Sequence, residues 1–245
     1  MLDAVSRRRR LRRCVEVLRT GPHANGVDRE VLHDMRRAWG NEAFCADIDF
    51  LAQTAVRALR GPGPFLECGS GISTIVAAAL AHRHGGRVWS LEQDRAWYER
   101  IRATLGELGI TNVTLWYAPL SKRGDFVWFD LQGRSLPSAF SHVFCDGPAV
   151  FETAWEEPFC SSWRSGVVPV LEDAGIRFDE ILLDDAGDPR AELLCRRWRI
   201  AGLATSVVPA TTGSFILARP GSGGAPGPGW STSPGPGAKR QASRA

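Results

Sequence analysis

Two glycines follow a short apolar run near residue 65, where they could let the backbone approach a ligand closely. Gly69 and Gly71 lack the Cβ atom that would hinder a sharp turn or a bound group. The helix predicted from Ser73 offers free backbone N–H groups at its start. A nucleotide cradle is one interpretation, and a plain tight turn between strand and helix is the alternative. Thr74 stands where the dinucleotide fingerprint GxGxxG requires its third glycine, so a dinucleotide is disfavoured.

An acid ends the next apolar run. Glu92 lies 21 residues after Gly71, at the end of a second predicted strand. A carboxylate at this position can accept both hydrogen bonds from a ribose diol, as in known nucleoside sites. A helix cap or a surface acid is the alternative. Together, the glycine loop and Glu92 favour a nucleoside-binding site.

Three further acids follow two apolar runs that are interpreted as the fourth and fifth strands. Asp146 follows His142–Cys145, and Glu172 and Asp173 follow Val167–Leu171. Because neighbouring parallel strands end at the same edge of a sheet, the three carboxylates could converge there. Oxygen ligands suit Mg²⁺, which could activate and orient a substrate hydroxyl. The alternative is that Asp146 contacts a cofactor while Glu172 and Asp173 are loop acids or helix caps.

The elements that must position these residues alternate along the chain. Helices are predicted over Asp28–Ala38, Ala43–Leu59, Ser73–Arg83, Arg95–Leu108 and Pro189–Ile200. Strands are predicted over Pro64–Cys68, Val88–Leu91, Val113–Tyr117, His142–Cys145, Val167–Leu171, Ser206–Val208 and Ser214–Ala218. This α/β alternation implies right-handed βαβ units and a Rossmann-like, doubly wound, mostly parallel seven-stranded sheet whose last strand is antiparallel.

Four segments resemble the class I S-adenosylmethionine-dependent methyltransferases. They are FLECGSGIST, VWSLEQDRAWYERI, VTLWYAPL and HVFCDGP. The likeness is closest to a small bacterial branch with an ECGSG loop, an LE-x-D strand end and DGP after the fourth strand. WGNEAF at 39–44 and VLEDA at 170–174 are also similar to that branch, so the resemblance covers about residues 35–218.

The resemblance implies a cofactor and its contacts. Glu92 would bind the ribose hydroxyls, Ala118 and Pro119 would lie by the adenine, and Asp146 would face the methionine amino group or the transfer centre. The residues expected to bind S-adenosylmethionine are Glu67, Gly69, Ser70, Gly71, Ser73, Thr74, Glu92, Ala118 and Asp146. Asp146 is also the candidate catalytic residue, and Asp146, Glu172 and Asp173 are the candidate Mg²⁺ ligands.

The acceptor pocket is expected between Tyr117 and Ala139 and after Pro148, where the sequence departs from the family pattern. Trp128, Trp155 and Trp163 could stack on a flat or sugar-like acceptor. Ordinary packing is the alternative for all three. With an activated methyl donor, the protein mainly has to align the reactants, which can supply about 7–11 kcal/mol of the barrier.

Charge is distributed unevenly over the 245 residues. The net charge of +3 combines +5 in residues 1–20, −5 in residues 21–219 and +3 in residues 220–245. A basic nucleic-acid-binding core is therefore disfavoured. Residues 1–24 are predicted to form a basic N-terminal arm or an amphipathic helix, which could instead contact RNA or an anionic membrane. Residues 25–219 are predicted to form the methyltransferase domain, and residues 220–245 a disordered Gly/Pro/Ser tail.

Cysteine spacing and hydropathy indicate a cytoplasmic protein. The six cysteines are scattered without a CxxC pair, which favours reduced thiols. No apolar stretch is long enough to be a transmembrane segment. The favoured function is S-adenosylmethionine-dependent methylation of a small-molecule acceptor at oxygen. The alternatives are methylation of RNA or protein, a non-catalytic binding module with this fold, and a nicotinamide-dependent oxidoreductase. The oligomeric state is left open.

Overall fold

Apolar side chains alternate between the two faces of a central sheet and build a separate core on each face. The computed structural model describes residues 4–23, 26–40, 45–123, 126–148, 164, 166–188, 190–211 and 213–221. Phe65, Phe144 and Leu182 belong to one core, whereas Leu66 and Cys145 belong to the other. Successive strand residues point to opposite faces, so strands with two apolar rows must be covered on both sides.

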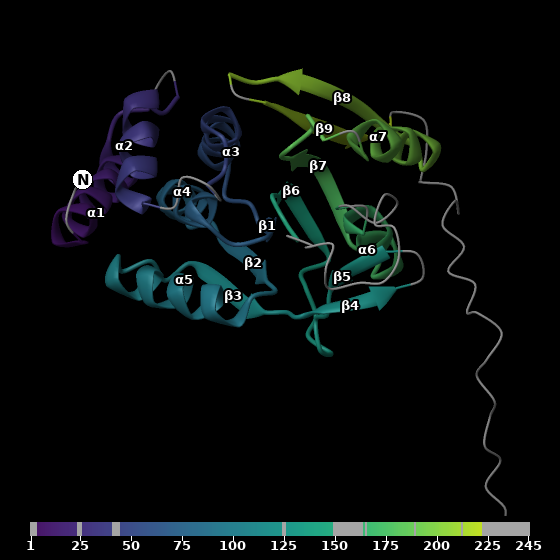
Figure 1. Cartoon of the computed structure of the whole chain (residues 1–245), viewed down its shortest axis with the longest axis horizontal. Helices are drawn as coiled ribbons and strands as arrows, with labels where there is room; N and C mark the ends of the chain where they lie inside the picture. Colours follow the sequence, from purple (N-terminus) through teal and green to yellow (C-terminus); the bar gives the residue numbers. More distant parts are fainter. Residues whose placement is uncertain are drawn as a thin grey trace, which may run out of the picture.

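The sheet has seven strands in the order β3-β2-β1-β6-β7-β9-β8 (Figure 1). The strands are β1 (Phe65–Cys68), β2 (Val88–Glu92), β3 (Val113–Tyr117), β6 (Ala139–Cys145), β7 (Arg177–Leu183), β8 (Leu203–Pro209) and β9 (Ser214–Pro220). All neighbours pair in parallel except β9, which is antiparallel to both β7 and β8. The predicted Rossmann-like, doubly wound sheet with an antiparallel last strand is confirmed.

Helices cover both faces of this sheet. On one face lie α1 (Ala4–Thr20), α2 (Arg29–Trp39), α3 (Ile48–Arg60), α4 (Ile72–Ala81) and α5 (Arg95–Glu107). On the other face lie α6 (Val167–Asp173), α7 (Arg190–Ile200) and a two-stranded hairpin of β4 (Leu120–Arg123) and β5 (Phe126–Phe129). Figure 1 shows α1 and α2 side by side at one side of the molecule and α7 near β8 and β9 at the other.

The basic N-terminal segment forms the predicted amphipathic helix. Leu11, Cys14, Val15 and Leu18 of α1 are buried and pack with α2 and α4 in the same core as the sheet. Several arginines on its other face pair within the chain: Arg8 lies 3.4 Å from Glu107, and Arg10 lies 3.6 Å from Asp34. The division of the chain at residues 24 and 219 stays a prediction, and the predicted disordered tail lies outside the described residues from 222 onward.

The predicted strand Val167–Leu171 is wrong, because these residues form the helix α6. The run VVPVL is apolar and β-branched, which favours a strand, but all five residues are buried in a short helix. Pro169 falls in its first turn, where a missing N–H costs nothing. The fifth strand of the sheet is β7. It was not predicted because its first half (RFDE) is charged and lacks the apolar pattern of a buried strand. The β4–β5 hairpin was not predicted either.

Within the described ranges, no helix is both long enough and apolar enough to cross a bilayer.

Candidate functional site

The loop after β1 and the loop after β6 meet at the carboxyl edge of the sheet. Cys68, the last residue of β1, joins the two loops. Its backbone carbonyl accepts hydrogen bonds from Asp146 N at 3.0 Å and from Gly147 N at 2.7 Å. Gly69 has a φ of +94°, and a Cβ added there would lie 2.7 Å from the backbone nitrogen of Gly147. This position therefore requires glycine for both its conformation and its surroundings. The two loops form the junction where open α/β sheets bind ligands.

Glu67 is a buried carboxylate behind the glycine loop. Its Oε2 accepts hydrogen bonds from the hydroxyls of Thr74 at 2.5 Å and Ser90 at 2.6 Å. Its Oε1 is buried and has no hydrogen-bond partner among the described residues. Burial raises the pKa of Glu67 to about 7, although the hydroxyls of Ser90, Thr74 and Ser73 act in the opposite direction.

Thr74 links this carboxylate to the loop. Its hydroxyl donates to Glu67 and also accepts a hydrogen bond from the backbone N–H of Gly71 at 2.9 Å. Thr74 therefore satisfies one of the free N–H groups at the start of α4. This explains a threonine at the position where a dinucleotide loop requires glycine.

Glu92 ends β2 beside the same loop and is buried. Its Oε2 accepts hydrogen bonds from the Ser70 hydroxyl at 2.6 Å and the Ser70 N–H at 3.1 Å, and its Oε1 accepts from the Asp94 N–H at 2.8 Å. Burial raises the pKa of Glu92, and these donors act in the opposite direction. Trp97 donates its indole N–H to the Ser70 carbonyl at 2.8 Å, which fixes the loop from outside.

Ala118 follows β3 at the same edge. It is fully buried, and its N–H donates to the Glu92 carbonyl at 2.8 Å. The ends of β1, β2, β3 and β6 thus bring together the predicted cofactor residues Glu67, Gly69, Ser70, Gly71, Ser73, Thr74, Glu92, Ala118 and Asp146. Their contacts with a cofactor stay a prediction.

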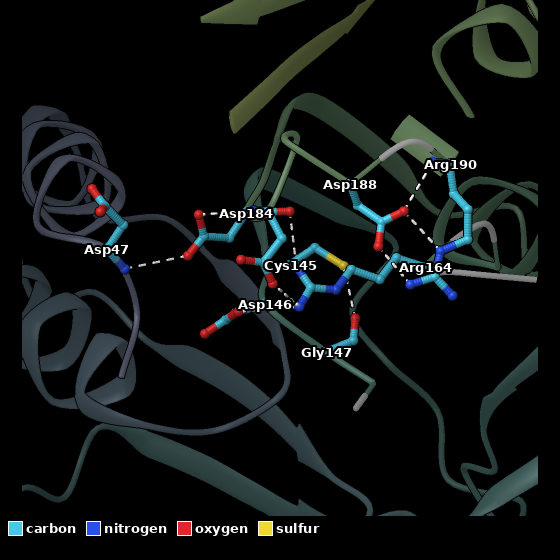
Figure 2. A network of polar contacts seen from close by, with 9 residues as sticks. Asp47, Cys145, Asp146, Gly147, Arg164, Asp184, Asp188 and Arg190 are labelled. Carbon is cyan, nitrogen blue, oxygen red and sulfur yellow. Dashed lines mark hydrogen bonds and ion pairs between the residues drawn. The ribbon is translucent and has the colours of Figure 1, made fainter. Parts of the chain in front are cut away.

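Asp146 faces an arginine that the sequence analysis did not single out. Arg164 Nη2 lies 3.3 Å from Asp146 Oδ1 and 2.7 Å from Asp185 Oδ2, and its Nη1 donates to the Asp184 carbonyl at 2.8 Å. Figure 2 shows the Arg164 side chain directed toward Asp146 and Asp184. Burial raises the pKa of Asp146, Arg164 opposes that shift, and Asp184 and Asp185 reinforce it.

Asp184 and Asp185 are the acids that end the fifth strand. Asp184 is buried, and its carboxylate accepts hydrogen bonds from Asp185 N at 2.9 Å and Asp47 N at 3.4 Å. Burial is the main cause that raises the pKa of Asp184 to about 6. Asp47 caps α3, so this carboxylate also ties α3 to the site (Figure 2). The sequence does contain a signal for this pair, because Asp184 and Asp185 directly follow the apolar end of β7. The two acids were not predicted as site residues because β7 was not predicted as a strand.

The predicted Mg²⁺ ligand set is not brought together. Glu172 and Asp173 end α6 and precede β7, whereas Asp146 follows β6. A seven-residue strand spans about 20 Å, so Glu172 and Asp173 lie toward the opposite edge of the sheet from Asp146. Among the described residues, no group of three or more His, Cys, Asp or Glu side chains could hold a metal ion.

Of the three tryptophans predicted to contact the acceptor, the structure describes only Trp128. Trp128 is buried, with its ring 5.3 Å from that of Phe129 in an edge-on contact, which agrees with the packing alternative. Trp155 and Trp163 lie outside the described residues, as does the rest of the segment from 149 to 163.

Comparisons with known proteins agree on the fold. The chain matches a Podospora anserina methyltransferase, PaMTH1, solved with S-adenosylhomocysteine bound, with a TM-score of 0.57 and 15% identity over 80% of this chain and 91% of that one. It also matches the METTL16 methyltransferase domain, with a TM-score of 0.53 and 11% identity over 79% of this chain and 80% of that one. The sequence matches no family model and no curated protein. The chain therefore has the fold of the class I methyltransferases.

Proposed function

We propose that this protein is an S-adenosylmethionine-dependent methyltransferase that acts on a small-molecule acceptor at oxygen. The observation that carries the proposal is the pair of buried carboxylates, Glu67 and Glu92, on either side of the Gly69–Gly71 loop. Buried acids without a cationic partner are costly, which makes them candidates for a functional role.

The residues present fit the chemistry of that cofactor. The unpartnered Oε1 of Glu67 is an acceptor for the N–H donors of an ammonium group. Glu92 can bind a ribose diol, for which the Ser70 hydroxyl would have to yield its place on Oε2. Gly69 keeps the loop free of a side chain where the two loops meet. When bound, S-adenosylmethionine supplies an activated methyl group.

Asp146 is the proposed catalytic residue of this chain. It lies at the carboxyl end of β6 with 27% of its side chain exposed, so it can reach a substrate. Its raised pKa makes its carboxylate a better proton acceptor for an acceptor hydroxyl than an ordinary aspartate would be. Arg164 holds the carboxylate in position and lowers that pKa in part.

The small-molecule acceptor is favoured over RNA by the placement of the basic residues. Arg12 donates to the Glu107 carbonyl at 3.0 Å, and Arg19 donates to the Gly109 carbonyl at 2.9 Å, so part of the arginine content of α1 serves to attach this helix to α5. An acceptor on RNA or protein is the alternative. A filter-binding assay that shows salt-sensitive RNA affinity near the micromolar range would favour it.

Titration calorimetry with S-adenosylhomocysteine tests the proposal. We expect binding at one site, weakened at least tenfold by Glu92→Gln and abolished by Gly69→Val. Exposed Glu192 on α7 provides the matched control, and Glu192→Gln should leave the affinity unchanged. A flat titration on protein that is folded by circular dichroism would refute the cofactor assignment. Binding without methyl transfer to any tested acceptor would favour the non-catalytic alternative.

A further inference from the structure

A cavity of about 550 Å³ lies at the outer edge of the sheet and is not lined by the glycine loop. It is formed by α5, by the edge strand β3 and by the turn that follows β5. Glu67, Gly69, Glu92 and Asp146 are not among the described residues that line it. Its volume is within the range of small-molecule sites in proteins. It therefore provides space for a ligand other than the one proposed for the glycine loop.

Aromatic side chains are concentrated in this cavity. Tyr98 and Tyr117, which line it, are the only two tyrosines in the sequence. Their ring centroids are 6.0 Å apart. Trp116, which also lines the cavity, precedes Tyr117 on β3 and points to the opposite face of the strand, where it packs against the core that contains Trp128. All three are half-buried, so part of each ring remains accessible. Such rings are the usual surfaces on which planar ligands stack.

Two arginines lie over these rings at cation–π distance. The Arg95 guanidinium lies 5.1 Å from the centroid of Tyr117 and 5.8 Å from that of Tyr98. The Arg134 guanidinium lies 5.6 Å from the centroid of Trp116, and its Nη1 donates to the Tyr117 carbonyl at 2.9 Å. A guanidinium that lies over an aromatic ring can still donate N–H groups to an oxyanion, and the planar fork of arginine matches the geometry of phosphate.

The cavity has a positive charge within an acidic region of the chain. Arg95, Arg102 and Arg134 oppose a single acid, Glu99. Glu99 lies 3.3 Å from Arg95 and 2.7 Å from Arg102, so it holds the two arginines close to each other. The net charge of the lining is +2, whereas residues 21–219 together carry −5. This local reversal of charge favours an anionic ligand.

The backbone at the rim adopts an uncommon conformation that places Arg134. Gln132 and Gly133 both have positive φ, of 51° and 78°. Arg134 N donates to the Leu131 carbonyl at 2.9 Å and closes the turn. A glutamine in the left-handed region is disfavoured, and such conformations concentrate at ligand-binding sites.

We propose that this cavity binds a nucleotide, that is, a phosphate ester attached to an aromatic base. Arg95, Arg102 and Arg134 bind the phosphate, and the base stacks on the tyrosine rings or on a guanidinium face. A free nucleotide and a nucleotide within single-stranded nucleic acid present the same chemistry. The site is distinct from the glycine loop and does not depend on methyl transfer.

Calorimetry on the full chain tests this site, with and without saturating S-adenosylhomocysteine to block the glycine loop. The ligands are adenosine monophosphate, adenosine, inorganic phosphate and an eight-nucleotide single-stranded RNA. We expect adenosine monophosphate to bind under both conditions, and adenosine and phosphate to bind at least tenfold more weakly. Arg95→Gln and Arg134→Gln should each weaken nucleotide binding about tenfold and leave S-adenosylhomocysteine binding unchanged.

Arg196 on α7 is an exposed arginine near the opposite edge of the sheet, so Arg196→Gln is the matched control and should have no effect. RNA affinity at least tenfold above that of the mononucleotide, lost in the same variants, identifies nucleic acid as the source. Equal or weaker RNA affinity identifies a free nucleotide. The proposal is overturned if no nucleotide binds to folded protein, if S-adenosylhomocysteine displaces it, or if both cavity variants bind normally.

Discussion

Gly69 and Gly147 pass each other with no room for a side chain on either residue. A Cβ at Gly147 would lie 2.8 Å from the Gly69 Cα and 3.1 Å from the Cys68 carbonyl oxygen. The two glycines belong to the loops after β1 and β6, the strands at the centre of the sheet. Their contact sets how closely the two halves of the candidate site approach each other.

Gly147→Ala should disrupt this contact. Because both neighbours of the added methyl are backbone atoms, the loops have to separate, and we expect the free energy of unfolding to fall by about 1–3 kcal/mol. S-adenosylhomocysteine binding should weaken with it. Gly106→Ala is the matched control, because Gly106 lies in α5 with open space around it and should gain about 0.5–1 kcal/mol. Equal stability of the two variants would contradict the steric argument.

Ser70→Ala should separate stability from binding. The variant removes one hydrogen bond from buried Glu92 and should cost about 1–2 kcal/mol in chemical denaturation. It also removes the group that a ribose diol would have to displace, so affinity for S-adenosylhomocysteine should hold or increase. Ser90→Ala, which removes a similar bond from Glu67, should lower stability without that increase. A large loss of affinity in Ser70→Ala would show that Ser70 itself binds the ligand.

Glu67 should make stability depend on pH. Its pKa is raised from 4.5 to about 7 in the folded protein, so the folded state holds this proton to a higher pH than the unfolded chain does. Its contribution is complete below about pH 4.5 and is lost as the pH rises toward 7. Glu67→Gln, which stays neutral, should therefore be more stable than the parent at pH 8 by up to about 3 kcal/mol and similar at pH 4. The free energy of unfolding of both proteins would be measured by urea titration across this pH range. A difference between them that does not change with pH would contradict the prediction.

Arg164 should act as a positioning residue through Asp146. Arg164→Gln removes the cation that lowers the pKa of Asp146, so the carboxyl should stay protonated to a higher pH. The pH profile of methyl transfer, or of ligand binding, should shift upward in this variant. Arg164→Lys keeps the charge without the forked contacts and should restore part of the shift. A loss of stability with an unmoved pH profile would reduce Arg164 to a structural role.

Asp173→Asn should leave the candidate site unchanged. Asp173 is exposed at the end of α6 and precedes β7, so it is remote from the loops that carry Glu92 and Asp146. We expect the same S-adenosylhomocysteine affinity as the parent, both in EDTA and in Mg²⁺. If Mg²⁺ changed the S-adenosylhomocysteine affinity of the parent but not that of Asp173→Asn, Asp173 would have to be a ligand of the metal.

The first half of the fold, from β1 to β3, could be predicted from the sequence because its apolar runs are also its strands. β1, β2 and β3 are short apolar runs followed by turn residues, and the acids and glycines at their ends lie at one edge, as predicted. The second half was harder, because β7 begins with the charged run RFDE while α6 is a continuous apolar run. Local pattern cannot distinguish a short buried helix from a strand, and here tertiary packing decides.

The missing parts of the candidate site follow from the same limit. Asp184 and Asp185 could be placed only once β7 was known, and Arg164 lies outside any helix or strand. Its contact with Asp146 joins positions 18 residues apart, for which the sequence has no periodic signal. An acid at a strand end could therefore be predicted wherever the strand itself was predicted. Arg164, the cationic partner of Asp146, could not be predicted.

The contacts of the helix α1 can form only in the order in which its partners are synthesised. Its buried face packs on both α2 and α4, so α1 can pair with α2 once residue 39 has been made, whereas its contact with α4 must wait until residues 72–81 have followed. During that interval the part of this apolar face that α4 covers would be exposed on a nascent chain beside a run of arginines. Ribosome-bound intermediates that end before α4 should therefore be the ones most prone to bind chaperones.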